Sequence, residues 1–211
     1  SLETAAVTGI VLQTDLPATG AFETSDPAVN RLQANIRWSQ RANEFENPTD
    51  CPQRDERFGW TGDTQFFLRT ATFNFDVSTL FEKWLGDVRD AQQPDGEFTD
   101  YAPKLDETNS APAYSDAGVI CPWILYERFG DTRVLAESYG PMKAWIEYQR
   151  KNSHDLLRPN EGFGDWLSPD AAVSKYAPTP KDLIGTAYFA YTTELVRRTA
   201  EVLVKTKDAA Y

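Results

Sequence analysis

The sequence lacks the residues that metal and cofactor sites usually require. Its 211 residues include two cysteines, Cys51 and Cys121, and a single histidine, His154. Two cysteines allow one disulfide bond but do not make a disulfide-stapled scaffold. One histidine and two distant cysteines disfavour a zinc site, and no acidic stretch has the spacing of an EF-hand calcium loop. No Gly-rich phosphate loop or nucleophile-elbow motif is present either. We therefore expect no metal ion and no cofactor.

Long apolar runs and positive charge are also scarce. No run approaches the ~18 apolar residues of a membrane span, and no basic start followed by an apolar core marks a signal peptide. The 32 Asp and Glu residues outnumber the 21 Lys and Arg residues and give a net charge of −11. Such a surface repels nucleic acid and anionic membranes, so we expect neither as a partner. These features leave the cellular compartment open.

Aromatic residues are abundant, with six Trp, nine Tyr and twelve Phe. Several of them lie in stretches rich in Gly, Pro and Asp, which are not typical of a core. Sugar rings pack their C–H faces on aromatic planes, while sugar hydroxyls need carboxylates and guanidinium groups as hydrogen-bond partners. The composition of these stretches therefore points to a carbohydrate site.

Apolar periodicity and helix-start signals predict six helices and almost no strand. The clearest amphipathic stripe follows Asp76, the expected cap of the third helix. We expect Pro122 to kink the fourth helix and Gly140-Pro141 to break the fifth. The first twenty residues predict a short strand and a turn. The predicted helices span 27–43, 64–72, 76–90, 116–129, 131–151 and 183–205.

Three connections between these helices are long, at roughly 43–62, 91–115 and 152–182. Consecutive helices in compact all-α folds usually run antiparallel, which places all three long connections at one end of the array. Loops longer than ~15 residues are uncommon unless they are functional or disordered. The pattern therefore predicts a site built from loops on a helical scaffold.

Each long connection carries its own polar and aromatic cluster. The first is the richest, with four carboxylates, two arginines and a tryptophan between residues 50 and 63. A glycosidase needs one carboxylic acid to protonate the leaving oxygen and one carboxylate opposite it. Chemistry alone does not choose among the candidates, and a solvated ion-pair network remains the alternative. The four carboxylates are Asp50, Asp55, Glu56 and Asp63.

The stretch from Asp50 to Asp63, DCPQRDERFGWTGD, closely resembles the signature of α-L-rhamnosidases of glycoside hydrolase family 78. Residues 19–23, before the first helix, also resemble that family's entry to its catalytic module. Further segments similar to the family are 83–87, 91–93, 115–117, 122–123, 125–126 and 164–166.

The resemblance implies an all-α, (α/α)6 toroid of six helical hairpins in two concentric rings. It also implies hydrolysis of terminal α-L-rhamnose with inversion, by a glutamic acid and a second glutamate that acts as base. By match to the signature, Glu56 is the expected general acid. The family often has Trp where this chain has Tyr114, and a tyrosine can still stack on a sugar. The expected substrate-binding residues are Asp50, Arg54, Trp60, Asp63, Tyr114, Asp116 and Trp166.

Six helices make three hairpins, so the resemblance covers the first half of the toroid. Residues 1–20 are then a linker or the end of a preceding β domain, and 21–211 the N-terminal half of the catalytic domain. The general base is expected in the missing C-terminal half, since Glu194 and Glu201 lack its motif and are expected at the surface. The expected partners are rhamnose-containing glycans or glycosides. The alternatives are a non-catalytic carbohydrate-binding or structural fragment, and another (α/α)6 carbohydrate-active enzyme.

Overall fold

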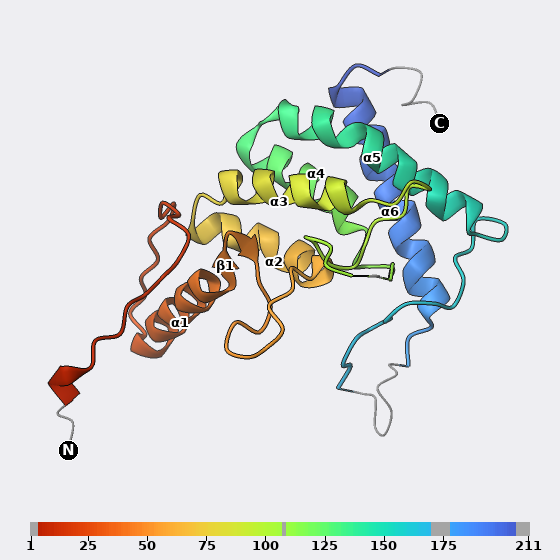
Figure 1. Cartoon of the computed structure of the whole chain (residues 1–211). Helices are drawn as coiled ribbons and strands as arrows, with labels where there is room; N and C mark the ends of the chain where they lie inside the picture. The colour runs from red at the N-terminus through yellow and green to blue at the C-terminus, as the bar shows by residue number, and fades with distance from the viewer. Residues whose placement is uncertain (1–3, 107–108, 170–177, 206–211) are drawn as a thin grey trace.

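In the part of the chain that the structure describes, six α-helices form the fold, as the apolar periodicity predicts (Figure 1). The structure is a computed structural model that describes residues 4–106, 109–169 and 178–205. A two-residue antiparallel pair, β1 (Glu44–Phe45) with β2 (Asn47–Pro48), follows the first helix. The helices are α1 (Pro27–Asn43), α2 (Thr61–Asn74), α3 (Ser78–Ala91), α4 (Ala117–Phe129), α5 (Thr132–Lys151) and α6 (Lys181–Val202).

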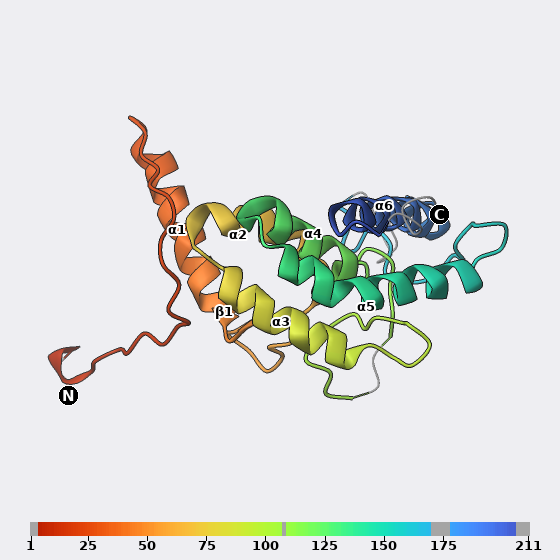
Figure 2. The ribbon, with the colours of Figure 1, turned by 90° about the horizontal axis from the view of Figure 1, so that it is seen from above.

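The helices lie in two rows, which Figure 2 shows from above. Helices α2, α4 and α6 form one row, α3 and α5 form the other, and α1 lies at the end of the array beside α2. The central helix, α4, packs against α2, α3, α5 and α6. This position explains why α4 is apolar on nearly every side, because a helix without a solvent face has no use for a polar stripe. No helix of the described ranges combines the length and apolar character needed to cross a bilayer.

Helix α3 buries the amphipathic stripe that its sequence predicts. Trp84 is fully buried, and its indole Nε1 donates a hydrogen bond to the Ala102 carbonyl oxygen at 3.0 Å. The helix begins one residue later than a cap at Asp76 predicts, because Val77 is the N-cap. Asp76 still accepts hydrogen bonds from the Ser78 amide and hydroxyl groups, so it satisfies a backbone donor of the first turn. The buried members of the stripe are Leu80, Phe81, Trp84, Leu85 and Val88.

Two local predictions are wrong. Helix α5 runs without a break through Gly140-Pro141, because buried residues on both sides, among them Leu135 and Met142, hold it in the core. Pro141 has no N–H group to donate to the carbonyl oxygen of Glu137, four residues earlier. Glu137 is exposed, so water can donate to this oxygen instead. The predicted N-terminal strand is absent from residues 4–20. A 3-10 turn at Thr4–Ala6 and exposed chain take its place, and the segment meets the fold through an isolated antiparallel bridge between Ala18 and Phe75. Pro122 lies inside α4, which is one helix.

The long connections contact one another. The first connection (44–60) joins α1 to α2, the second (92–116) joins α3 to α4, and the third (152–180) joins α5 to α6. The Trp60 backbone pairs with Tyr101 of the second connection, and the Trp60 ring contacts Phe163 of the third. The prediction that three connections meet on the helical scaffold is therefore confirmed.

Candidate active site

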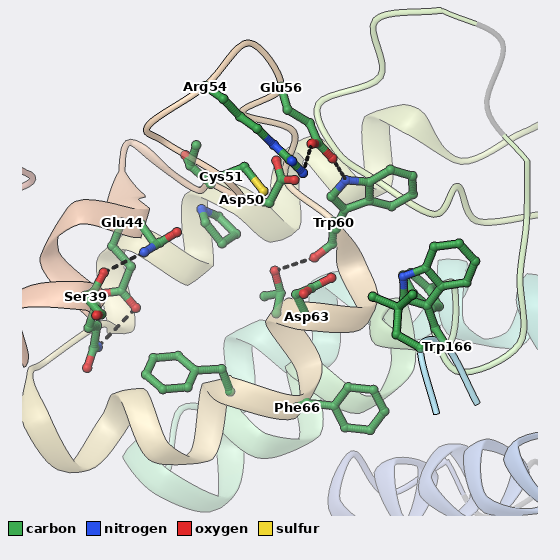
Figure 3. Close-up of a pocket in the computed structure, with 18 of the residues that line it drawn as sticks. Ser39, Glu44, Asp50, Cys51, Arg54, Glu56, Trp60, Asp63, Phe66 and Trp166 are labelled. Carbon is green, nitrogen blue, oxygen red and sulfur yellow. Dashed lines mark hydrogen bonds and ion pairs between the residues drawn. The ribbon is translucent and has the colours of Figure 1, made fainter. Parts of the chain in front are cut away.

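A pocket of about 880 Å³ lies where the three connections meet (Figure 3). Its walls come from all three connections, from the first turns of α2, from the end of α1 and from Phe81 of α3. Every predicted site residue except Asp116 lines it. The residues that matter below are Asp50, Cys51, Arg54, Glu56 and Trp60 of the first connection, Asp63 of α2, Tyr114 of the second connection, and Phe163 and Trp166 of the third.

The first connection is shaped by close backbone contacts. Its amide groups at Asp50 and Arg54 donate to the carbonyl oxygens of Phe58 and Cys51 at 3.0 and 3.1 Å, which closes the loop on itself. At Gly59 a Cβ atom would lie 2.1 Å from the carbonyl oxygen of Ala102, so no side chain fits there. The glycine in the signature is therefore required because the first and second connections touch through their backbones.

Glu56 is held from two sides. Its Oε2 accepts a hydrogen bond from Arg54 Nη2 at 2.7 Å, and its Oε1 accepts one from Trp60 Nε1 at 3.3 Å. The hydrogen bond with Asp50 is the largest influence that lowers the pKa of Glu56, and the bonds from Trp60 and Arg54 lower it further. The side chain is therefore a carboxylate at rest, although the predicted role is that of an acid.

The pKa of Asp50 shifts in the opposite direction, upward. Its Oδ1 atom is buried without a hydrogen-bond partner. Burial raises the pKa of Asp50 to about 6, and the hydrogen bond with Glu56 adds to that rise. Two neighbouring carboxyl groups cannot both ionise freely, and here the structure favours the proton on Asp50.

Four aromatic rings from the three connections form a wall of the pocket. The Trp60 ring lies edge-on to those of Tyr114 and Phe163, with centroids 6.0 and 6.1 Å apart. Phe163 in turn contacts Trp166 at 5.5 Å. Trp166 is 47% exposed, so one face of the wall is open to a ligand. Sequence reasoning missed Phe163, although its place between Gly162 and Gly164 in a tryptophan-bearing loop was a signal.

Asp116 does not reach the pocket. It is fully buried, and its two carboxylate oxygens accept hydrogen bonds from the Ala113 amide at 2.8 Å and from Trp145 Nε1 at 2.9 Å. Ala113 has a positive φ of 70° and directly precedes Tyr114. Asp116 therefore lies behind the wall and fixes the backbone that carries Tyr114. Its spacing in the sequence could not show that both of its oxygens are already occupied.

Two buried acids have no sequence signal: Glu44, which lines the pocket, and Asp100, which does not. Glu44 is 3% exposed, and Gln40 Nε2 donates to both of its oxygens at 3.1 and 3.0 Å. Burial raises the pKa of Glu44 to about 7, and the bond from Gln40 opposes the rise. Asp100 is 2% exposed with an unpartnered Oδ1, and burial raises its pKa to about 6. Burial of an acid depends on distant neighbours, which a local pattern does not reveal.

The raised pKa of Glu44 predicts a pH-dependent cost. The folded state holds this proton more tightly than the unfolded state, so the stabilisation is complete below about pH 4.5 and is lost as the pH rises through about 7. At ~1.4 kcal/mol per pH unit, the charged form costs about 3 kcal/mol. Glu44→Gln keeps one of the two bonds from Gln40 but has no charge to bury. Between acidic and mildly alkaline pH, the free energy of unfolding of this variant should therefore rise by about 3 kcal/mol relative to that of the wild type, as measured by urea unfolding.

The control is Glu23→Gln, which removes an exposed acid. Its unfolding free energy should follow that of the wild type at every pH. Parallel pH profiles for Glu44→Gln and the wild type would show that Glu44 is solvated and not buried as the structure has it.

The paired helices, with an acidic and aromatic pocket between their connections, define the class of protein as a helical-hairpin domain. The family model described as the bacterial alpha-L-rhamnosidase 6 hairpin glycosidase domain matches residues 17–211, and the chain belongs to this family. The resemblance in the sequence and the predicted all-α fold are both confirmed.

Two alpha-L-rhamnosidases are similar in sequence to nearly the whole of this chain. The alpha-L-rhamnosidase of Streptomyces avermitilis is 48% identical over 208 residues, which are 98% of this chain and 19% of that protein. That of Formosa agariphila is 39% identical over 206 residues, 97% of this chain and 22% of that protein. The chain thus spans about a fifth of the length of these relatives.

Solved structures of the same class superpose closely. The crystal structure of the S. avermitilis alpha-L-rhamnosidase complexed with L-rhamnose matches with a TM-score of 0.91 at 45% identity, over 96% of this chain and 19% of that one. The native enzyme from Aspergillus terreus matches with a TM-score of 0.90 at 37% identity, over 100% of this chain and 25% of that one.

Proposed function

We propose that the protein hydrolyses terminal α-L-rhamnosides with inversion and that Glu56 is the general acid. The observation that carries the proposal is the position of Glu56. It lies between Arg54 and Trp60, in a pocket whose other walls are carboxylates and aromatic rings. These are the groups that a sugar ring and its hydroxyls require.

The pocket offers two kinds of contact to a sugar, apolar and hydrogen-bonding. The rings of Trp60, Tyr114 and Trp166 offer apolar faces for the C–H face of the sugar. Asp50 and Asp63 can accept hydrogen bonds from its hydroxyls, and the exposed guanidinium of Arg54 can donate. Such contacts hold the glycosidic oxygen near the Glu56 carboxyl group. A second carboxylate, ~6.5–9.5 Å from the acid, must activate the water in an inverting enzyme. We assign that base to none of the described residues.

A panel of aryl glycosides tests the proposed specificity. The protein, expressed from its complete gene, is assayed with p-nitrophenyl α-L-rhamnoside and with the matched α-L-mannoside, which differs by one hydroxyl group. We expect the rhamnoside to have the highest kcat/KM of the panel. A higher kcat/KM for another glycoside would indicate a different helical glycosidase, and binding without turnover would indicate a carbohydrate-binding protein.

Gly62 provides a test of the aromatic wall. A Cβ atom at this position would lie 2.7 Å from two ring carbons of Tyr114. Gly62→Ala must therefore displace the Tyr114 ring, and we expect KM for the rhamnoside to rise about tenfold, since small displacements of binding groups are costly. The matched control is Gly140→Ala, because Gly140 has open space around its Cβ position within α5. That variant should leave KM unchanged, because Gly140 lies in α5 and does not line the pocket. An unchanged KM for Gly62→Ala would remove Tyr114 from the sugar subsite.

A further inference from the structure

The contacts of Glu56 leave its acid role incomplete. One of its oxygens accepts from Arg54 and the other from Trp60, and both donors are groups that always keep their protons near neutral pH. A carboxyl group held in this way is ionised at rest. Before each turnover, a general acid in this position must therefore be protonated again.

Asp50 is placed to provide that proton. One of its carboxyl oxygens, one oxygen of Glu56 and the Sγ atom of Cys51 lie within 4.8 Å of one another. The Asp50 Oδ1 atom is buried and has no hydrogen-bond partner. The other carboxyl and guanidinium groups that line the pocket are those of Arg54, which contacts Glu56, of Asp63 in α2, and of the buried Glu44.

We propose that Asp50 is a proton relay that acts through Glu56, an inference that rests on the proposed function. An O–H bond of Asp50 breaks as an O–H bond of Glu56 forms. Glu56 then passes this proton to the glycosidic oxygen while the bond between that oxygen and the anomeric carbon breaks. Asp50 takes a proton from solvent after product leaves, so the enzyme returns to its starting state.

The electrostatics of the pair agree with this direction of transfer. Burial raises the pKa of Asp50 to about 6, while its hydrogen bond to Glu56 is the main influence that lowers the pKa of Glu56. When the pair holds a single proton, that proton therefore rests on Asp50. When a sugar displaces Arg54 or Trp60 from Glu56, the Glu56 carboxylate loses a stabilising donor and becomes the better proton acceptor.

The test compares two substrates that share the sugar but differ in leaving group. The p-nitrophenolate ion leaves without protonation, whereas the alcohol of methyl α-L-rhamnoside needs a proton. For Asp50→Asn, in the protein expressed from its complete gene, the ratio of aryl to alkyl kcat/KM should rise at least about tenfold over wild type, as for the loss of a proton donor. The ratio is taken on one sample, so partial unfolding cancels. The matched control is Asp63→Asn, which should slow both substrates equally and leave the ratio unchanged.

The double variant Asp50→Asn, Glu56→Gln distinguishes a relay from two separate effects. Groups that act in series are not additive, so the double variant should show the same ratio as Glu56→Gln alone. An unchanged ratio for Asp50→Asn would overturn the relay and leave Asp50 as a contact to the sugar. A raised ratio for Asp50→Asn with an unchanged ratio for Glu56→Gln would also overturn it, because Asp50 would then be the acid itself. Failure of the wild type to cleave either rhamnoside would instead overturn the proposed function.

Discussion

Glu56→Gln should lower kcat on an alkyl α-L-rhamnoside by at least about 100-fold, the usual contribution of general acid catalysis. Glutamine has nearly the same shape, and its amide oxygen can still accept a bond from Arg54 or Trp60, but it has no proton to give to the leaving oxygen. Because the Glu56 side chain is partly exposed, with 27% of its surface accessible, the fold should tolerate the change. Steady-state kinetics with purified variants measure the effect.

Asp55→Asn is the matched control for Glu56→Gln. Asp55 is the neighbouring carboxylate of the same signature, but it is exposed and lies outside the pocket. This variant should retain turnover within a few-fold of the wild type. Near-normal hydrolysis of the alkyl substrate by Glu56→Gln would exclude Glu56 as the acid.

Trp84→Ala should lower the free energy of unfolding by about 3–5 kcal/mol, the usual cost of removing a buried tryptophan side chain. Trp84 is fully buried on α3, packs edge-on against Phe81, and donates to the carbonyl oxygen of Ala102. The Ala102 amide in turn donates to the Gly59 carbonyl oxygen, so Trp84 also supports the backbone contact beneath the signature loop. Urea unfolding followed by circular dichroism measures the loss.

Trp166→Ala is the variant to compare with Trp84→Ala. Trp166 is 47% exposed and lies in the third connection at the pocket. Its replacement should raise KM for the rhamnoside while the unfolding midpoint moves little. A loss of stability as large as that of Trp84→Ala would place Trp166 in the core and remove it from the sugar subsite.

Much of the helical fold could be predicted because its signals are local. A cap at Asp26 followed by Pro27 begins α1 where the structure does, and Gly130 ends α4 in the left-handed conformation that favours glycine. Gly140-Pro141 misled the prediction of α5 because a local rule for breaking helices cannot weigh the packing on both sides. The predicted N-terminal strand is wrong for a similar reason, since the apolar residues of that segment do not identify a partner strand.

The site could be predicted where its residues are adjacent in the chain. The signature holds Asp50, Arg54, Glu56 and Trp60 within a few residues, and the backbone contacts of one loop bring them together. The parts that depend on distant neighbours could not be predicted. Asp116 is of a residue type that often binds ligands, but both of its oxygens accept hydrogen bonds from groups of the protein interior. Glu44 gives no sign in the sequence that its carboxyl group is buried against Gln40 of α1.

Proton NMR of the anomeric signals during hydrolysis tests the central claim most directly. The protein expressed from its complete gene is mixed with an α-L-rhamnoside, and the first free sugar is recorded before mutarotation. If water attacks the face opposite the bond that Glu56 protonates, β-L-rhamnose must appear first and α-L-rhamnose only later. Release of α-L-rhamnose first, or no release of rhamnose, would contradict an inverting rhamnosidase built on this pocket.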